Sequence, residues 1–244
     1  MAGNERVSQF EKALLDLRAQ ILNGRFEANS RLAETALAAH LGISRTPLRQ
    51  AMDRLVDEGL LERTETGRCR VASFTMDDII DAIEMRGVIE GTAARLAAER
   101  GADPALVAEC RRVLAALDLA TARDDAVDFR AYMRLNARFH ELIGALSGSR
   151  VVQREVERAS RLPLASPSAF LQGQEVVAAF LHSLPRAQLQ HHDILDAILS
   201  REGARAEALA REHARLAREN LKYAMQAGPE VAARVPGLTL VSNT

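Results

Sequence analysis

The chain has 244 residues, of which 48% are hydrophobic and only 4% aromatic, with no tryptophan and a formal net charge of −1. This length suits two domains of ordinary size, and cores built mainly from Leu, Ile, Val and Ala are typical of helical proteins. The balanced charge excludes a global basic excess as the source of nucleic-acid binding. Any such binding must depend on where the charges lie.

Targeting signals and disulfides are not expected. No apolar run approaches the ~18–20 residues that a membrane span needs, and no signal-peptide pattern opens the chain. Cys69 and Cys110 are the only cysteines and lack a CxxC spacing, so we expect two free thiols. We therefore expect a cytoplasmic protein without membrane association.

The first part of the chain predicts three helices with a tight turn between the last two. Residues 8–22, 33–41 and 44–58 have apolar side chains at helical spacing. Gly42 lies where the chain must turn sharply. Ser44 is suited to cap the third helix by accepting hydrogen bonds from its free N–H groups. This order of features is typical of a helix-turn-helix.

The third helix carries its basic residues at its N-terminal end. Arg45 and Arg49 are one turn apart and project together, with Thr46 beside them, whereas Asp57 and Glu58 lie at the other end. A helix that enters the DNA major groove by its N-terminus places such positions against base edges and phosphates. The alternative is an ordinary helical pair with solvated arginines.

A short hairpin is predicted after the third helix. Residues 60–63 and 69–72 read as two strands, with Gly67 in the turn and Arg68 next to it. Gly67 would let the backbone come close to a phosphate or a groove wall. We therefore expect residues 1–74 to form a winged helix-turn-helix DNA-binding domain, with Arg68 in its contact surface.

Residues 75–228 predict an all-α domain for effector binding and dimerisation. Segment 163–174 contains prolines and a glycine, and is expected to be a loop or broken helix that either lies across a pocket or is a plain connector. No strand pattern appears after residue 75, so the fold class is mainly α, a winged helix followed by a helical bundle. Residues 229–244 form a C-terminal tail without a strong pattern. Helices are expected at 76–100, 104–122, 125–146, 149–161, 185–200 and 204–226.

Three of the six histidines lie on apolar helix faces. Asn136 and His140 are four residues apart and share a face, His191 lies on the core side of its helix, and His213 shares a stripe with Asn220. One buried histidine usually means a satisfied core hydrogen bond, but three pointing inward need a partner for their lone pairs. Three imidazoles and an amide oxygen suit a divalent transition metal such as Zn²⁺ or Ni²⁺.

Arg86 is a candidate for binding an anionic ligand. It lies in the helix predicted at 76–100, with Glu90 one turn further on. Its guanidinium either grips a carboxylate of an effector or pairs with Glu90 within the helix. Asn220, on the stripe of His213, is the second candidate for contact with the effector.

The N-terminal pattern resembles a known family of DNA-binding proteins. Residues 8–72, above all LAAHLGISRTPLRQAMDRLVDEGLL, resemble the N-terminal domain of the GntR family of bacterial transcription factors. The resemblance implies that Arg45 and Arg49 contact operator bases and phosphates, and that Gly67 lies in the minor groove. Relatives often carry an arginine or an acid near Thr35, a position where this chain can at most donate or accept a hydrogen bond.

The C-terminal pattern resembles the FCD effector domain of the FadR-type branch of that family. The match over residues 78–225 implies metal ligands at Asn136, His140, His191 and His213. Such domains also use Asp at the first position, so the asparagine either weakens the metal or favours an anionic effector. The run DAIEMRGVIEGTAARLAAERG resembles regulators of vanillate and related aromatic-acid breakdown, which implies a small organic or aromatic acid.

These features together predict a DNA-binding transcriptional regulator, not an enzyme. We expect a repressor that acts as a homodimer on an inverted repeat and responds to a small carboxylate at a metal site. The alternatives are a regulator for which the metal itself is the signal, a purely structural metal, and a metal-dependent hydrolase. The hydrolase is disfavoured because no carboxylate stands one turn from a metal histidine as a general base.

Overall fold

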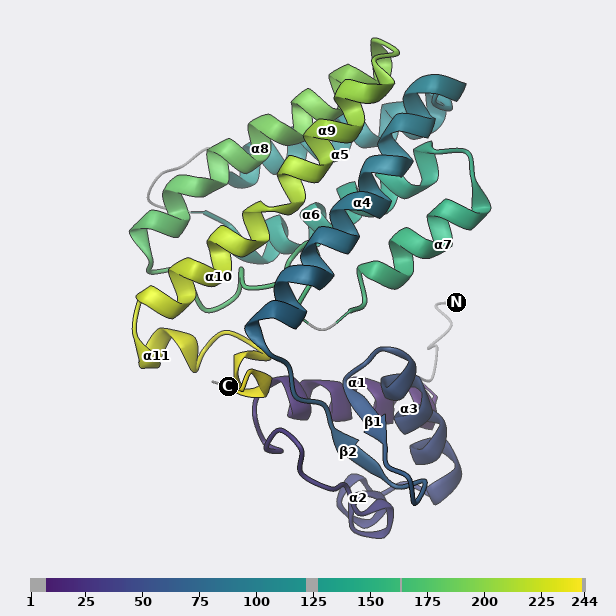
Figure 1. Cartoon of the computed structure of the whole chain (residues 1–244), viewed down its shortest axis with the longest axis vertical. Helices are drawn as coiled ribbons and strands as arrows, with labels where there is room; N and C mark the ends of the chain where they lie inside the picture. Colours follow the sequence, from purple (N-terminus) through teal and green to yellow (C-terminus); the bar gives the residue numbers. More distant parts are fainter. Residues whose placement is uncertain (1–7, 122–126, 163, 243–244) are drawn as a thin grey trace, which may run out of the picture. The chain divides into compact units, whose positions relative to one another are not determined.

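The computed structural model describes residues 8–121, 127–162 and 164–242, and they divide into two compact units. One unit contains the chain up to Met76 together with residues from Pro236 onward, and the other contains Asp77–Val235. The predicted fold class is confirmed: the structure is mainly α, with one two-stranded sheet (Figure 1). No described helix is long and apolar enough to span a membrane.

The first unit is a winged helix-turn-helix. Its helices are α1 (Gln9–Leu22), α2 (Glu34–Leu41) and α3 (Arg45–Asp57), and its wing pairs β1 (Leu61–Arg63) with β2 (Cys69–Val71) in antiparallel register. The side chains of Leu17, Ile21, Leu48 and Leu55 are fully buried in its core, because the helical spacing of these residues puts them on inward faces.

The turns of this unit follow the sequence pattern with one exception. Gly42 has φ +64° and Gly67 has φ +76°, left-handed conformations that glycine adopts without steric cost. Ser44 occupies the N-cap position of α3 as predicted, but the expected hydrogen bond from its side chain to the helix is not formed. That part of the prediction is wrong, and it leaves the Ser44 hydroxyl exposed at the tip of α3.

The C-terminal residues complete the first unit. We call Pro236–Ser242 the clasp; it contains the short 3-10 helix η1 (Leu238–Leu240) and lies against α1 (Figure 1). The side chain of Leu240 is fully buried in the same core as Leu17 and Leu48. Val241 pairs with Phe74 as an isolated parallel bridge. The DNA-binding unit is therefore discontinuous in sequence.

The second unit is a bundle of helices. Its long helices are α4 (Met76–Arg100), α5 (Pro104–Thr121), α6 (Phe129–Leu146), α8 (Ala178–Leu199), α9 (Gly203–Ala214) and α10 (Leu216–Gln226), with the shorter α7 (Arg150–Ala159) and α11 (Pro229–Ala232). Asp103, Asp128 and Ser149 cap the N-termini of α5, α6 and α7 through their side-chain oxygens. Both cysteines of the chain are buried and unpaired with each other, as expected.

Two glycines bring α4 close to α9. A Cβ atom on Gly91 would lie 2.9 Å from Arg211 Cγ, and one on Gly87 would lie 3.0 Å from the Cβ of Ala214. Since no larger residue fits at Gly91 without a shift, this contact fixes the spacing of the two helices. Arg86 and Glu90, which directly precede Gly87 and Gly91 on α4, are buried in the interior of the bundle.

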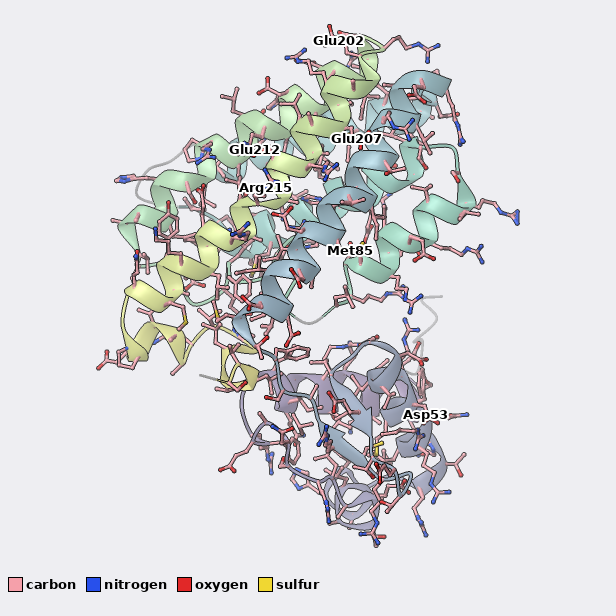
Figure 2. The ribbon with its side chains drawn as sticks, in the orientation of Figure 1. Asp53, Met85, Glu202, Glu207, Glu212 and Arg215 are labelled. Atoms are coloured by element: carbon pink, nitrogen blue, oxygen red, sulfur yellow. The ribbon has the colours of Figure 1, made fainter. Side chains whose placement is uncertain are left out.

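Several helix boundaries differ from the prediction. The helix expected at 125–146 is α6 and begins at Phe129, while residues 122–126, which include the predicted boundaries at 122 and 125, lie outside the described residues. A helix was expected to begin at Pro185, but α8 begins at Ala178 and contains Pro185. Burial of Phe180 and Leu184 holds the turn before the proline, and this packing outweighs one lost backbone hydrogen bond. The single helix expected at 204–226 is broken at Arg215, which Figure 2 labels between α9 and α10.

Residues 164–177, which we call the strap, connect α7 to α8 and pack on the bundle. Leu164, Phe170 and Leu171 are buried, and Gln174 is fully buried. The strap contains no regular helix, in agreement with the expected loop or broken helix; Pro163, part of that expectation, lies outside the described residues. Leu164 and Phe170 have φ of +60° and +63°, which is uncommon for residues with bulky side chains.

We expect Leu240→Ala to destabilise the DNA-binding unit by about 2–5 kcal/mol, because it opens a cavity in a filled core. Native-state hydrogen exchange of α1 and α3 amides measures this loss. Leu119→Ala, at a side chain that is 80% exposed on α5, is the control and should change little. Unchanged exchange in α1 and α3 of Leu240→Ala would contradict a structural role of the clasp.

Candidate metal centre and nucleic-acid interface

Three histidines from three helices meet inside the bundle. His140 comes from α6, His191 from α8 and His213 from α9, and all three side chains are buried. One ring nitrogen of each lies within 4.8 Å of the others, a spacing that one metal ion could bridge. The three residues that the sequence patterns selected on separate helices therefore lie together.

The second ring nitrogen of each histidine faces an oxygen acceptor. Nδ1 of His140 lies 3.0 Å from Glu90 Oε1, and Nδ1 of His191 lies 3.0 Å from Gln188 Oε1. Nδ1 of His213 lies 3.1 Å from Gln190 Oε1. In this arrangement each Nδ1–H donates outward, so each neutral ring keeps its lone pair on Nε2, facing the centre.

The inward nitrogens lack suitable partners within the described protein. Nε2 of His140 is buried and forms no hydrogen bond, while Nε2 of His191 lies 2.9 Å from Nε2 of His213. Two lone pairs at that distance repel each other unless a proton or cation lies between them. A proton on either ring would still leave the His140 lone pair unsatisfied. A divalent cation bound by all three nitrogens satisfies them together, so these residues fit a metal.

Burial keeps two of these rings neutral. It lowers the pKa of His191 and His213 well below the usual histidine range, because a charge on either ring would be buried and would lie close to the other histidine rings. Burial alone would raise the pKa of Glu90, but the charges and hydrogen bonds of His140 and Arg86 outweigh burial and hold that pKa at about 2. The structure thus offers two neutral imidazoles, on His191 and His213, and an ionised carboxylate beside His140.

Asn136 is hydrogen-bonded to the strap. It is buried one turn before His140, and its Nδ2 donates to the carbonyl of Pro167 at 3.0 Å. A weaker contact of 3.4 Å reaches Ser168 Oγ. Within the described residues, no donor reaches its Oδ1, so this oxygen is available as a ligand. The NH2 group of the Asn136 amide is therefore hydrogen-bonded to the strap.

Arg86 is buried, and of the two roles that the sequence left open, the structure contains the pairing with Glu90. Its Nη1 lies 3.4 Å from both Glu90 oxygens, so the pair within the helix exists with long distances. Its Nη2 donates to the carbonyl of Ala214 at 3.2 Å, at the break between α9 and α10. Its Nε has no partner among the described residues. Asn220 is buried on α10, and its backbone carbonyl accepts from Gln174.

The predicted DNA-contacting residues lie on an exposed surface of the winged helix. The side chains of Arg45 and Arg49 are 61% and 58% exposed. Both approach one carboxylate, with Glu34 Oε2 2.7 Å from Arg49 Nε and 3.8 Å from Arg45 Nη2. Because exposed ion pairs of this kind are weak, the two arginines remain available for DNA. Ser44, Thr46, Gly67 and Arg68 are also exposed.

Sequence reasoning missed several residues that position these groups. Gln188 precedes His191 by three residues on the same helix, so the i,i+3 spacing could have revealed it. Gln190 reaches His213 across two helices, and no local pattern predicts that contact. Glu34 lies on α2 and meets Arg49 only through the turn at Gly42.

Comparisons with known proteins agree with this architecture. Residues 10–71 match the family described as "Bacterial regulatory proteins, gntR family", and residues 81–216, more than half of the chain, match the FCD domain. The HTH-type transcriptional repressor GlaR of Escherichia coli (strain K12) is 28% identical over 81% of this chain and 88% of its own length.

Another regulator and a solved structure are also similar to this chain. The HTH-type transcriptional regulator YdhC of Bacillus subtilis (strain 168) is 28% identical over 60% of this chain, and the match spans 64% of YdhC, less than two thirds. The structure of E. coli McbR/YncC has a TM-score of 0.62 at 21% identity, covering 91% of this chain and 100% of that chain. It shows a shared fold.

We expect His191→Ala to abolish high-affinity Zn²⁺ binding, since it removes one of three converging ligands. Gln188→Leu should weaken binding about 10–100-fold, because it removes the acceptor that orients His191. Competition with a chelating dye measures both affinities.

His182→Ala changes an exposed histidine on the same helix and is the matched control. Wild-type Zn²⁺ affinity in His191→Ala would contradict the proposed centre. Wild-type affinity in Gln188→Leu alone would contradict the orienting role of the carboxamide.

Proposed function

Because the chain belongs to the GntR family of bacterial transcriptional regulators and carries an FCD domain, we propose that it is a repressor controlled by a small carboxylate at its metal centre. The observation that carries the proposal is the convergence of His140, His191 and His213, each with its Nδ1 facing an acceptor. DNA binding and regulation of transcription are properties of the family. Repression is supported by the likeness to GlaR, a transcriptional repressor.

Operator recognition is assigned to the tip of α3 and to the wing. Arg45 and Arg49 present exposed guanidinium groups from the first turns of α3, where a helix in the major groove meets base edges. Thr46 and Ser44 add hydroxyl groups at the same end. In the wing, Arg63 Nη1 donates to the Gly67 carbonyl at 3.0 Å, and this bond steadies the turn that would approach the minor groove.

The charge of the centre favours an anionic ligand. Three neutral imidazoles and the neutral amide of Asn136 leave the two positive charges of a divalent ion uncompensated, while Arg86 and Glu90 offset each other. A metal with three imidazole ligands and an amide oxygen keeps positions open for a carboxylate. Zn²⁺ and Ni²⁺ are the ions that such a donor set suits best, and Arg86 Nε and Asn220 are the groups we assign to the rest of the effector.

A route for the effector lies beside the strap. A pocket of about 310 Å³ opens between α6, α7 and the strap, and Arg161 and Ser166 contribute to its lining. Pro167 and Ser168 form part of its wall, and the same two residues contact Asn136 on their other side. Movement of the strap would therefore join this pocket to the metal centre.

A homodimer matches the two-fold symmetry of an inverted-repeat operator. Two winged helices related by a two-fold axis read the two halves of an inverted repeat. The bundle carries exposed apolar side chains on α4, where Met85 is 56% exposed and Val88 38% exposed. Figure 2 labels Met85 on this helix. We assign the self-association surface to this face of α4.

Two of the alternatives still need an experiment, whereas the third does not. The family consists of transcriptional regulators and not of enzymes, which sets the hydrolase aside. A metal sensor and a structural metal use the same three histidines. In a metal sensor, the ion alone changes the affinity for the operator. With a structural metal, neither the ion nor an acid bound at the centre changes that affinity.

We expect Arg49→Ala to cost about 1–3 kcal/mol of operator binding if Arg49 contacts a base. The operator for this gel-shift titration is selected from a random DNA pool. Arg205→Ala, which removes a comparably exposed arginine from α9, is the control and should bind as wild type. Equal operator affinity of Arg49→Ala and Arg205→Ala would remove Arg49 from the interface.

We expect a carboxylic acid to release the operator only when the centre holds a metal. Operator affinity is titrated first against Zn²⁺ alone, and then against an aromatic acid such as vanillate and against citrate at fixed Zn²⁺. The His191→Ala protein is the control, and it should bind the operator but ignore the acid. Release by Zn²⁺ alone would favour the metal sensor, and no response to either would favour a structural metal.

A further inference from the structure

The clasp is held in the DNA-binding unit by side-chain burial and by a fixed backbone register. Leu240 is fully buried, and Thr239 lies 3.0 Å from where a Cβ atom on Gly24 would be. The Phe74 N–H donates to the Leu240 carbonyl at 2.9 Å, and the Ser242 N–H donates to the Phe74 carbonyl at 2.9 Å. These contacts belong to a built-in element and not to a loose tail.

The clasp also contacts the C-terminal end of α1. The Gly237 N–H donates to the Leu22 carbonyl at 2.7 Å. Helix α1 packs along α3, and Arg18 of α1 pairs at 2.8 Å with Glu58, the buried residue that ends α3. A displacement of the clasp therefore acts on the helix that supports the recognition helix.

The chain between α10 and the clasp has little slack. The Ala227 N–H donates to the Tyr223 carbonyl, and successive bonds from Ala232 to Val235 close helical turns. Val235, the last residue of the bundle unit, is 1% exposed. A short connection made of hydrogen-bonded turns transmits a displacement, whereas a flexible linker would absorb it.

The strap contacts the bundle end of this connection. A Cβ atom on Gly173 would lie only 2.7 Å from the carbonyl oxygen of Arg234, so the two backbones touch. The fully buried Gln174 donates to the carbonyl of Asn220 on α10 at 2.8 Å. At its other end the strap accepts the hydrogen bond from Asn136. A series of contacts thus runs from Asn136 through the strap to Arg234, and the chain itself continues from there into the clasp.

We propose that the strap and the clasp carry the state of the metal centre to the DNA-binding unit, as a second connection besides the one through α4. The chain passes between the two units twice, after Met76 and after Val235. The inference rests on the proposed function, because the signal begins at Asn136. If Asn136 Oδ1 held a metal, a shift of the amide towards the ion would change the hydrogen bond from its Nδ2 to the Pro167 carbonyl, and with it the position of the strap.

The strap has the features of an element with two arrangements. Leu164 and Phe170 are held in left-handed backbone conformations although their side chains are buried. Such conformations are costly and persist only while the surrounding contacts enforce them. A change in the Asn136 contact lets the strap relax, and Gly173 and Gln174 pass this change to Arg234 and α10. The metal centre and the DNA-binding unit then both favour one of the two arrangements of the strap, which is the physical requirement for coupling between them.

The test is an insertion of six Gly and Ser residues between Val235 and Pro236. The clasp can still fill its site, but the connection becomes slack. The readout is amide hydrogen exchange at Gly237, Phe74 and Ser242 in the full-length protein, with and without Zn²⁺. In the wild type we expect Zn²⁺ to change these exchange rates about fivefold or more, which is the low end of ordinary coupling between sites.

In the insertion variant these amides should remain protected but no longer respond to Zn²⁺, although Zn²⁺ still binds. The same six residues inserted after the exposed Gly148 are the control, and this protein should respond as the wild type. An equal response in both insertion variants would overturn the proposal. So would a wild type that binds Zn²⁺ without any change at the clasp.

Two further measurements keep the outcomes distinct. Asn136→Asp keeps an oxygen ligand but removes the donor to Pro167, so it should bind Zn²⁺ and lose the response at the clasp; a retained response would contradict the role of the strap. The metal content of each protein is measured as well. A wild type that binds no Zn²⁺ would overturn the proposed function itself, and the metal analysis identifies that outcome separately.

Discussion

The outward hydrogen bonds of three buried imidazoles are the constraint on which the rest of the bundle depends. Each Nδ1–H meets an oxygen of Glu90, Gln188 or Gln190, so the lone pairs on Nε2 have only one another to face. Leaving such lone pairs unpaired in a protein core is costly, and one cation bound by all three would remove that cost. The orienting groups come from α4 and α8, and the imidazoles from α6, α8 and α9. Correct assembly of four helices is therefore a precondition for the centre, and a bound metal would in turn stabilise that assembly.

Close approach of α4 to α9 makes this assembly possible. Gly87 and Gly91 let the backbones come near enough for Arg86 to reach the carbonyl of Ala214. That carbonyl is free because the helix breaks at Arg215, where the Arg218 N–H donates to the Arg215 carbonyl instead. The break thus turns a backbone acceptor towards a buried guanidinium, which is also held by Glu90. The pair of Arg86 and Glu90 therefore links His140 on α6 to the junction of α9 and α10.

Local patterns predicted what depends on local spacing. The helices of the winged unit, the exposed arginines of α3 and the inward direction of His140 follow from periodicity and turn residues. Contacts between distant segments were not predictable in this way. Proline signals usually mark helix starts, yet burial around Pro185 carried α8 through it. Leu240 gave no signal because its partners lie in the first part of the chain, and a short apolar segment has no periodicity to detect.

Asn136 shows why one substitution within a family pattern matters physically. An aspartate at this position would neutralise part of the metal charge, but it could not donate a hydrogen bond to Pro167. The asparagine lacks that negative charge and gains a donor, which ties the proposed metal ligand to the strap at 3.0 Å. A metal bound with this amide would leave the centre more positive, and the same amide is linked to a segment that touches both α10 and Arg234. In our proposal, the stronger demand for an anion and the coupling to the clasp therefore have the same origin, the amide group of Asn136.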